Sequence, residues 1–355
     1  MRIIQAMGAR GFGGAEAFFV RLAKAFHDRG LEQKLLIANN HSRMKKFDRE
    51  GIPYKVLKFS GSLDFATKRL FQNEIQTFQP DIVLTWMSRA SHFCPLSTNI
   101  PFVSIARLGG YYNLKYYQNC QHLIGNTQDI VDYLSKEGWP KDHAHYIPNF
   151  VKKKNASPID KNVFDTPQDA PLILALGRLH ENKAFDTLIK SLVHTPKAYL
   201  WIGGEGPEHT ALAELATELG VQDRIRFLGW QEKVGPLFAT ADIFVCPSRH
   251  EPLGNVVIEA WANEIPVIAA ESAGPKSLIK NKKSGMLVPI DDPKVMGTTI
   301  QSLLESPALQ KPLIQEGVKA YEKNFTEDII VAKYLDFFEH ILSKREKKPC
   351  AASQV

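Results

Sequence analysis

The stretch Leu172-Ile173-Leu174-Ala175-Leu176, followed directly by Gly177-Arg178-Leu179-His180-Glu181-Asn182-Lys183, decides the fold class of this sequence. Five consecutive apolar residues are typical of a strand that is buried on both faces of a parallel sheet. The polar turn after them leads into a helix, which indicates one strand–turn–helix unit of an α/β fold. Open sheets of this kind bind ligands beyond the carboxyl ends of their strands, so the turn is a candidate binding site.

The same alternation of strands and helices runs along both halves of the sequence. Alternating elements with short loops predict parallel sheets that helices cover on both faces. Two such runs predict an α/β protein with two doubly wound, Rossmann-like domains that face each other across a cleft. We expect the strands at residues 2–7, 33–38, 54–57, 81–85, 102–106, 122–125 and 145–147, and then at 172–176, 199–202, 225–227, 243–246 and 266–269.

The two runs are separated by a polar, proline-containing stretch that begins with Lys152-Lys153-Lys154-Asn155. We expect an N-terminal domain over residues 1–155, a linker over 156–169 and a C-terminal domain over 170–326. A last helix at about 327–342 carries apolar residues at near-helical spacing. One of its faces is therefore expected to be buried, close to the interdomain region.

The composition is that of an ordinary soluble protein, with 44% hydrophobic and 23% charged side chains among 355 residues. No apolar run approaches the roughly 20 residues of a membrane-spanning helix, and Met1–Met7 is too short and too polar for a secretory signal. The cysteines are scattered, as in proteins of the reducing cytosol, so we expect a cytoplasmic protein. They are Cys94, Cys120, Cys246 and Cys350.

The excess of positive charge lies in the N-terminal half. Residues 1–150 carry 19 Lys and Arg against 12 Asp and Glu, whereas residues 151–355 carry 25 against 26. Residues 41–70 alone hold eight basic and three acidic side chains. This excess suggests an anionic partner, such as a membrane surface or a phosphorylated acceptor, or else a solvated surface. We do not expect nucleic acid, because the stretch belongs to a sheet domain without a known nucleic-acid-binding fold.

A second motif, His250-Glu251-Pro252-Leu253-Gly254-Asn255, follows the strand at 243–246, and Glu259 comes eight residues after Glu251. A helix over about 256–263 would place the end of the motif at its positively charged amino end, which suits a phosphate or a sugar hydroxyl. Gly254 permits close approach of a ligand to the backbone. The two carboxylates can accept hydrogen bonds from sugar hydroxyls, although by themselves they could be ordinary surface residues.

Arg178 and Lys183 are two cations five residues apart on the turn after the strand at 172–176. A diphosphate is well bound by such a pair, because Arg makes forked contacts and Lys supplies a point charge. The alternative is a pair of surface cations. Asp291-Asp292 follows an apolar stretch and is expected to cap a turn or a helix.

A glycine-rich loop, Gly8–Gly14, joins the first strand to the first helix. Its backbone amides lie at a helix amino end, where anions bind. Its glycine spacing fits neither the Gly-x-Gly-x-x-Gly dinucleotide motif nor the Gly-x-x-x-x-Gly-Lys-Ser/Thr loop. The loop is therefore suited to close approach, but not to NAD or a kinase-type triphosphate.

Five motifs in this order resemble the retaining glycosyltransferases of family 4, of the bacterial glycan or lipopolysaccharide type, over roughly residues 1–335. They are Gly-Gly-Ala-Glu at 13–16, Gly-Arg-Leu…Asn-Lys at 177–183, Gly-Gly-Glu-Gly-Pro-Glu at 203–208, Phe-Leu-Gly-Trp at 227–230 and Glu-Pro-Leu-Gly…Glu-Ala at 251–260. The resemblance implies a GT-B fold. It also implies transfer of a hexose-type sugar from a nucleotide diphosphate sugar to a hydroxyl of a glycan or lipid-linked glycan acceptor.

The resemblance also implies roles for single residues. Arg178 and Lys183 would hold the donor diphosphate, Glu251 would contact the donor sugar, and Glu259 would bind the ribose hydroxyls. Further donor contacts would come from Gly13 and Gly14 in the N-terminal loop, from the backbone of Leu253, Gly254 and Asn255, and from Leu228 or Gly229 near the base.

The acceptor side departs from the family pattern. Many relatives place a histidine after the strand at 102–106, where this sequence has Arg107. Arg107 could bind an anionic acceptor or a donor oxygen, or it could be part of a structural ion pair. His92 is the other candidate for a histidine in the cleft, and its alternative is an ordinary loop histidine.

No Asp-x-Asp signature of metal-dependent transferases stands out in the sequence, so we expect neither a metal nor a cofactor beyond the nucleotide sugar. A sugar phosphorylase of the same fold and a non-catalytic nucleotide-binding Rossmann protein are the alternatives. The spacing of the glycines at 8–14 argues against an oxidoreductase. The basic N-terminal half suggests a peripheral location at the inner face of a membrane.

Overall fold

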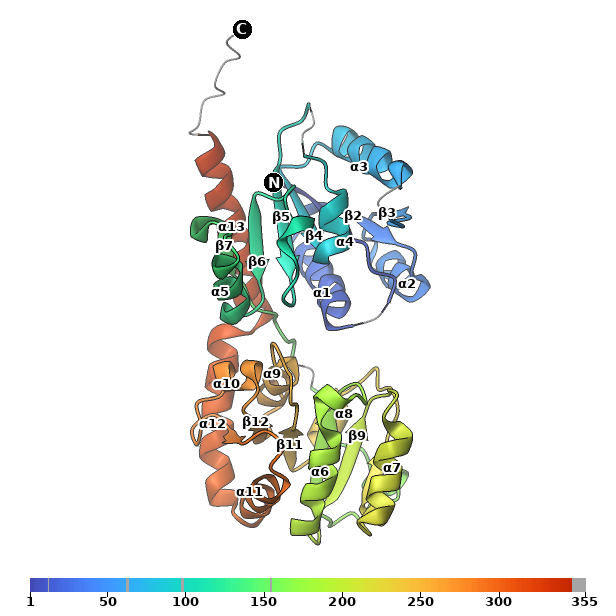
Figure 1. Ribbon diagram of the computed structural model, residues 1–355, viewed down its shortest axis with the longest axis vertical. Helices are drawn as coiled ribbons and strands as arrows, with labels where there is room; N and C mark the ends of the chain where they lie inside the picture. Colours follow the sequence, from blue (N-terminus) through green and yellow to red (C-terminus); the bar gives the residue numbers. More distant parts are fainter. Residues whose placement is uncertain (12, 62–63, 97–98, 154, 347–355) are drawn as a thin grey trace. The chain divides into compact units, whose positions relative to one another are not determined.

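The computed structural model describes residues 1–11, 13–61, 64–96, 99–153 and 155–346. The chain forms two compact units, one made of Met1–Phe150 with the segment from Glu327 onward, and one made of Val151–Thr326 (Figure 1). Of the four cysteines, Cys94, Cys120 and Cys246 are free and buried. Cys350 lies outside the described residues.

The first unit is built on a parallel sheet in the strand order β3-β2-β1-β4-β5-β6-β7. The strands are β1 (Arg2–Met7), β2 (Glu32–Ala38), β3 (Tyr54–Leu57), β4 (Ile82–Trp86), β5 (Val103–Leu108), β6 (His122–Gly125) and β7 (Ala144–Tyr146). The helices are α1 (Gly14–Asp28), α2 (His41–Glu50), α3 (Phe65–Phe78), α4 (Met87–Phe93), α5 (Gln128–Lys136) and α13 (Glu327–Glu346).

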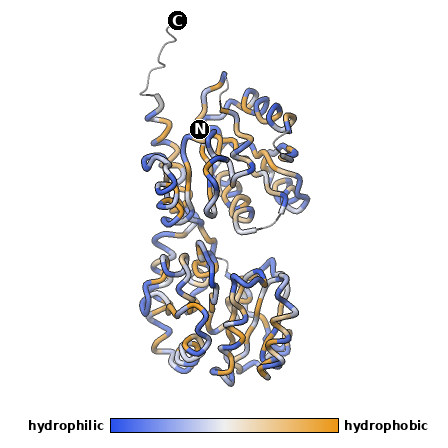
Figure 2. The backbone as a smooth tube through the Cα atoms, in the orientation of Figure 1, coloured by the Kyte–Doolittle hydropathy of each residue, from blue (hydrophilic) through white to orange (hydrophobic). Residues whose placement is uncertain are grey.

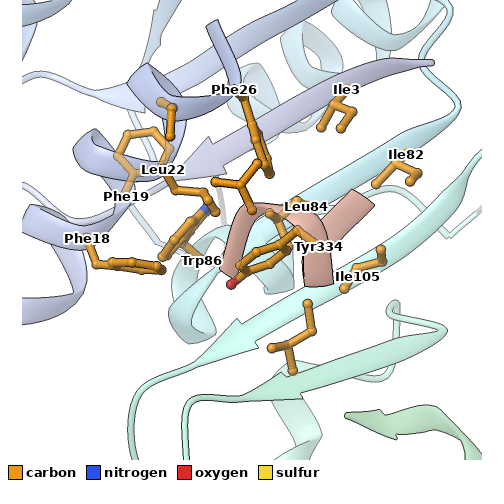
Figure 3. Close-up of a cluster of buried hydrophobic side chains, with 14 of the residues drawn as sticks. Ile3, Phe18, Phe19, Leu22, Phe26, Ile82, Leu84, Trp86, Ile105 and Tyr334 are labelled. Atoms are coloured by element: carbon orange, nitrogen blue, oxygen red, sulfur yellow. The ribbon is translucent and has the colours of Figure 1, made fainter. Parts of the chain in front are cut away.

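Helices cover both faces of this sheet because successive strand residues point to opposite sides. Ile3 belongs to the buried cluster that includes residues of α1 and α13, whereas Ile4 belongs to the cluster that includes residues of α3 and α4. Tyr334 of α13 lies among the aromatic side chains of the first cluster, near Phe26 (Figure 3). The helix α13 therefore completes the core of the first unit, and its predicted buried face is confirmed.

The second unit repeats the plan with the strand order β10-β9-β8-β11-β12-β13. The strands are β8 (Leu172–Leu176), β9 (Tyr199–Gly203), β10 (Ile225–Phe227), β11 (Ile243–Cys246), β12 (Val267–Ala270) and β13 (Met286–Val288). The helices are α6 (Phe185–Ser191), α7 (His209–Glu218), α8 (Gly235–Thr240), α9 (Asn255–Ala262), α10 (Ala273–Leu278), α11 (Pro293–Glu305) and α12 (Pro307–Asn324). All its strand pairs are parallel, so the predicted α/β class is confirmed.

The apolar run that decided the fold class lies at the centre of this second sheet. Ile173 and Ala175 face the cluster that contains residues of α6 and α11, and Leu172 and Leu174 face the cluster that contains residues of α9. Figure 2 shows that hydrophobic and hydrophilic stretches alternate along the backbone of each unit. None of the helices in the described part of the chain is long and apolar enough to cross a bilayer.

The segment expected as a linker, 156–169, belongs to the second unit. The backbone N–H of Ile159 donates to Thr240 at 2.7 Å, and the indole N–H of Trp201 donates to the hydroxyl of Thr166 at 3.0 Å. Phe164 packs edge-on against the ring of Trp201. The polar composition did not reveal this packing, because the apolar side chains that take part in it, Ile159 and Phe164, are only partly buried.

Candidate functional site

The predicted cations and the first predicted glutamate follow neighbouring strands in the second sheet. The strand order reverses between β8 and β11, since the chain adds β9 and β10 on one side of β8 and β12 and β13 beyond β11. Arg178 and Lys183 follow β8, and Glu251 follows β11. A reversal of this kind is where open α/β sheets bind ligands, because the two adjacent loops run to opposite faces of the sheet.

Lys183 and Glu251 are in contact. Lys183 ends a short 3₁₀ turn, Glu181–Lys183, and its ammonium group forms an ion pair with Oε2 of Glu251. The other carboxylate oxygen accepts a hydrogen bond from the backbone N–H of Gly254 at 3.1 Å. The side chains are 26% and 12% exposed, so the pair is only partly hydrated. The structure therefore brings together two residues that lie 68 positions apart in the sequence.

The loop after Glu251 is shaped by two glycines. Gly254 precedes α9 with φ of 79°, a left-handed conformation that favours glycine. Gly274 lies at the start of α10, where a Cβ atom would come within 2.6 Å of the backbone of Glu251 and Leu253, and its N–H donates to the carbonyl of Glu251. Leu253 is buried, and Asn255 opens α9. The sequence-based prediction missed Gly274, which holds this loop in place.

The other predicted donor residues surround the same end of the sheet. Arg178 has an exposed side chain, and Glu259 is half-buried on α9. Leu228 and Gly229 follow β10, and Gly229 has a φ of 64°. Arg178, Leu228 and Gly229 follow strands on the carboxyl side of the sheet, and Glu259 lies within α9. The contacts of these residues with a ligand stay a prediction.

The first unit has a second reversal of strand order, between β1 and β4. The glycine-rich loop follows β1, and its Gly13 and Gly14 are exposed at the amino end of α1. Arg43 of α2 supports this loop from within, donating to the carbonyl of Ala9 at 2.9 Å and to that of Gly11 at 3.1 Å. The sequence prediction counted Arg43 in the basic stretch, but its side chain is fully buried.

His92 lies on α4, the helix that follows β4 at this reversal. It is half-buried, and its ring packs edge-on against the rings of Phe93 and Tyr116. The position on an element next to the strand-order reversal agrees with a binding role, and the ring contacts agree with a packing role. Its contact with an acceptor stays a prediction.

Arg107 is 1% exposed at the end of β5. Its Nε donates to the hydroxyl of Tyr334 on α13 at 2.7 Å, and it also donates to the side chain of Asn149. The guanidinium lies 4.6 Å from the ring centre of Phe18 and 5.0 Å from that of Trp86, within the range of cation–π attraction. These contacts favour the structural alternative for Arg107, although its partners are a phenol, an amide and two rings instead of a carboxylate.

The two aspartates at 291 and 292 differ in role. Asp292 accepts a hydrogen bond from the N–H of Val295 and caps α11, as predicted. Asp291 binds Arg249, a residue that the sequence analysis did not select. Within the described ranges, no group of three or more His, Cys, Asp or Glu side chains is arranged to hold a metal ion.

Two solved structures share this arrangement of elements along almost their whole length. A glycosyltransferase from Rickettsia africae ESF-5 aligns with a TM-score of 0.86 and 21% identity over 96% of this chain and 98% of that one. Anabaena Alr3699/HepE, in complex with UDP and glucose, aligns with a TM-score of 0.81 and 19% identity over 95% and 99%. The class of protein follows from these likenesses: the chain has the GT-B fold with two Rossmann-like domains.

Sequence comparison narrows the class to a family. The model for glycosyl transferases group 1 matches residues 157–320, and the model for Glycosyltransferase Family 4 matches residues 12–154. The lipopolysaccharide core biosynthesis glycosyltransferases LpsD and LpsE of Rhizobium meliloti (strain 1021) are 35% and 34% identical over 94% and 91% of this chain, and over 97% and 95% of their own lengths. The chain belongs to the family-4 glycosyltransferases, as its motifs predicted.

Proposed function

We propose that this glycosyltransferase moves a hexose-type sugar from a nucleotide diphosphate sugar to a hydroxyl of a lipopolysaccharide core acceptor, with retention of anomeric configuration. The observation that carries the proposal is the contact between Lys183 and Glu251 at the reversal of the second sheet. The full-length similarity to two lipopolysaccharide core enzymes supports the acceptor class.

The residues suit a reaction in which charge develops on a departing diphosphate. The bond between the anomeric carbon and the diphosphate breaks, a bond to the acceptor oxygen forms, and the departing diphosphate takes the acceptor proton. Arg178, Lys183 and the amino end of α9 supply fixed positive charge for that leaving group. Glu251 accepts hydrogen bonds from the sugar, and Glu259 accepts them from the ribose. No metal ion is required in this scheme.

The nucleotide is proposed to be a uridine diphosphate, because a solved structure of the same fold carries UDP and glucose. The acceptor is proposed to be lipid-linked, and the basic N-terminal half would bring the enzyme to the inner face of an anionic membrane.

The test is a screen of nucleotide sugars for slow hydrolysis and for transfer to truncated lipopolysaccharide core, with and without EDTA. We expect turnover with one UDP-sugar, insensitive to EDTA, and binding of UDP in calorimetry. Turnover that requires inorganic phosphate instead of a nucleotide would show that the chain is a phosphorylase and would refute the proposal.

A further inference from the structure

We propose that Arg249 is a positioning residue that locks the Lys183 loop to the Glu251 loop, and so fixes the geometry of the sugar-transfer site. The inference rests on the proposed function for its consequence in catalysis, but its structural part stands on the contacts of Arg249 alone. Arg249 comes two residues before Glu251, and the residues to which it donates lie outside the predicted set of site residues.

The guanidinium group of Arg249 binds three segments of the second unit at once. Nε donates to Asp291 at 2.9 Å, ahead of α11, and one terminal nitrogen donates to Asp186 of α6 at 2.7 Å. The other terminal nitrogen donates to the backbone carbonyl of Glu181 at 2.7 Å. Glu181 begins the turn that ends at Lys183, so Arg249 holds the base of that turn directly.

The carboxylates are themselves held in place. Thr187 of α6 donates its hydroxyl to Asp291 at 2.9 Å, which closes a ring of contacts between α6, Asp291 and Arg249. A hydrogen bond from Arg249 is the main reason that the pKa of Asp291 lies below its ordinary value. Burial raises the pKa of Asp186, but the hydrogen bond from Arg249 and the charges around it outweigh burial and keep that pKa low as well. The carboxylates of Asp186 and Asp291 therefore stay ionised at neutral pH.

The same two loops are joined by one backbone bond, from the N–H of His250 to the carbonyl of Asn182 at 3.1 Å. Arg249 and His250 thus bind consecutive carbonyls of the turn, those of Glu181 and Asn182. The residue after Lys183, Ala184, has a φ of 51°, a left-handed conformation that costs energy in a residue other than glycine. Such a turn keeps its shape only when contacts with its surroundings stabilise it. The hydrogen bond from Arg249 to the carbonyl of Glu181 is one of these contacts.

A lysine cannot replace this set of contacts. The planar guanidinium offers donors in three directions at fixed angles, whereas an ammonium group on a flexible stem reaches one carboxylate well. We therefore expect Arg249→Lys to behave much like Arg249→Met in the site, although it preserves the charge. A shift of about 1 Å in the position of Lys183 is enough to cost up to roughly 100-fold in rate.

The matched control is Arg224, which also makes several hydrogen bonds but lies at the opposite end of the strands from the candidate site. It donates to the carbonyls of Leu192, Thr195 and Ala198, which precede β9, and it precedes β10 itself. These positions are at the amino ends of the strands. Loss of Arg224 removes three hydrogen bonds to backbone carbonyls, compared with four hydrogen bonds for Arg249, but it leaves the two loops of the site untouched.

The experiment compares the parent, Arg249→Met, Arg249→Lys and Arg224→Met by hydrogen exchange and by steady-state kinetics with a nucleotide sugar. We expect faster amide exchange in residues 178–186 for both Arg249 variants, and a fall in kcat of roughly 10- to 100-fold. Arg224→Met should leave exchange in this segment and kcat within about twofold of the parent. Asp291→Asn, a milder change at a half-exposed side chain, should give a smaller effect in the same direction.

Exchange in residues 178–186 that is no faster in the Arg249 variants than in Arg224→Met would overturn the proposal, as would unchanged kcat in a variant whose loop has opened. Exchange is measured without any sugar donor. If the parent itself turns over no nucleotide sugar, the proposed function fails, and the exchange data still decide whether Arg249 holds the loop.

Discussion

The ammonium group of Lys183 and the carboxylate of Glu251 form an ion pair between the loops that follow β8 and β11. Each residue is thereby oriented by the other, and Glu251 is oriented further by the N–H of Gly254. Without Lys183, the mostly buried carboxylate of Glu251 loses its positively charged partner and keeps the hydrogen bond from the N–H of Gly254. The side chain of Arg178, in contrast, is exposed. The two cations of the predicted diphosphate site therefore differ in what they contribute to the unliganded fold.

This difference predicts separate outcomes for two substitutions. Arg178→Ala and Lys183→Met should each lower turnover by about 100-fold or more, as for loss of a charge-stabilising group. Only Lys183→Met should also lower the free energy of unfolding, by about 1 kcal/mol after allowance for its partial exposure. Urea titrations and initial rates measure the two effects. If Lys183→Met lowers the free energy of unfolding no more than Arg178→Ala does, the ion pair does not stabilise the unliganded fold.

Glu259 offers a test of the nucleotide assignment. Glu259→Gln keeps the shape of the side chain but loses its charge, so the affinity for UDP should fall by about 1.5–3 kcal/mol if the carboxylate binds the ribose hydroxyls. Titration calorimetry with UDP, GDP and ADP gives the measurement. Glu316→Gln, at an exposed position on α12, is the control for loss of one negative charge. If the Glu259→Gln variant binds all three nucleotides as well as the parent does, Glu259 does not bind the ribose.

The first unit allows the role of Arg107 to be measured. Tyr334→Phe removes the hydroxyl that accepts from the buried guanidinium, and this should cost about 1–3 kcal/mol of unfolding free energy. In a double-mutant cycle with Arg107→Met, the losses should be less than additive because the two residues contact each other. Strict additivity, together with a loss of acceptor affinity in Arg107→Met at unchanged stability, would instead support the acceptor-binding alternative.

Much of this structure could be predicted because its signals are local. The apolar run at 172–176 and the glutamate motif at 250–255 each lie on one strand–loop–helix unit, and the parallel topology then brings their loops together. The roles of Arg43 and Arg249 could not be predicted, because their partners are backbone carbonyls and distant aspartates. The sequence shows which side chains are charged, but not which of them are buried in contact with the backbone.

The histidines at the β6–β7 edge predict a pH dependence of stability. Burial, and then the neighbouring His143 and His145, lowers the pKa of His122 to about 4, and burial, His143, His340 and Lys344 lower that of His145 to about 4, with Asp142 opposing. Because the unfolded chain binds protons near pH 6.5 and the folded chain does not, stability should be highest above pH 6.5 and fall as the pH drops towards 4.

Urea titrations at pH 7.5 and pH 5.0 measure this effect. The variant His122→Gln/His145→Gln should lose less stability between the two pH values than the parent, since it removes the groups that titrate. His194, outside this edge and on the other unit, provides the control substitution His194→Gln. An identical pH dependence in parent and double variant would show that other groups cause the acid loss.

The basic stretch at 41–70 is smaller on the folded surface than in the sequence. Arg43 is buried against the glycine-rich loop, and Lys55 lies 3.9 Å from Glu74. Lys45 and Arg49 are exposed on α2, and Arg69 is exposed on α3. Phe65, which begins α3, is 68% exposed and adds an apolar side chain to the same basic stretch. Lys58, which follows β3, is exposed as well. We expect these exposed residues to be the part of the stretch that contacts an anionic membrane.

Co-sedimentation with vesicles tests that contact. Each basic residue near an anionic bilayer contributes on the order of 1 kcal/mol, and the attraction fades over a Debye length of roughly 8–10 Å. We therefore expect binding to anionic vesicles at low salt, loss of binding at high salt, and a clear reduction in Lys45→Glu/Arg49→Glu. The variant Lys282→Glu/Lys283→Glu makes the same change of charge at exposed positions of the second unit and should bind like the parent. Equal recovery of all three proteins with neutral and anionic vesicles would mean that the basic stretch only solvates the surface, and that the acceptor reaches the enzyme without membrane contact.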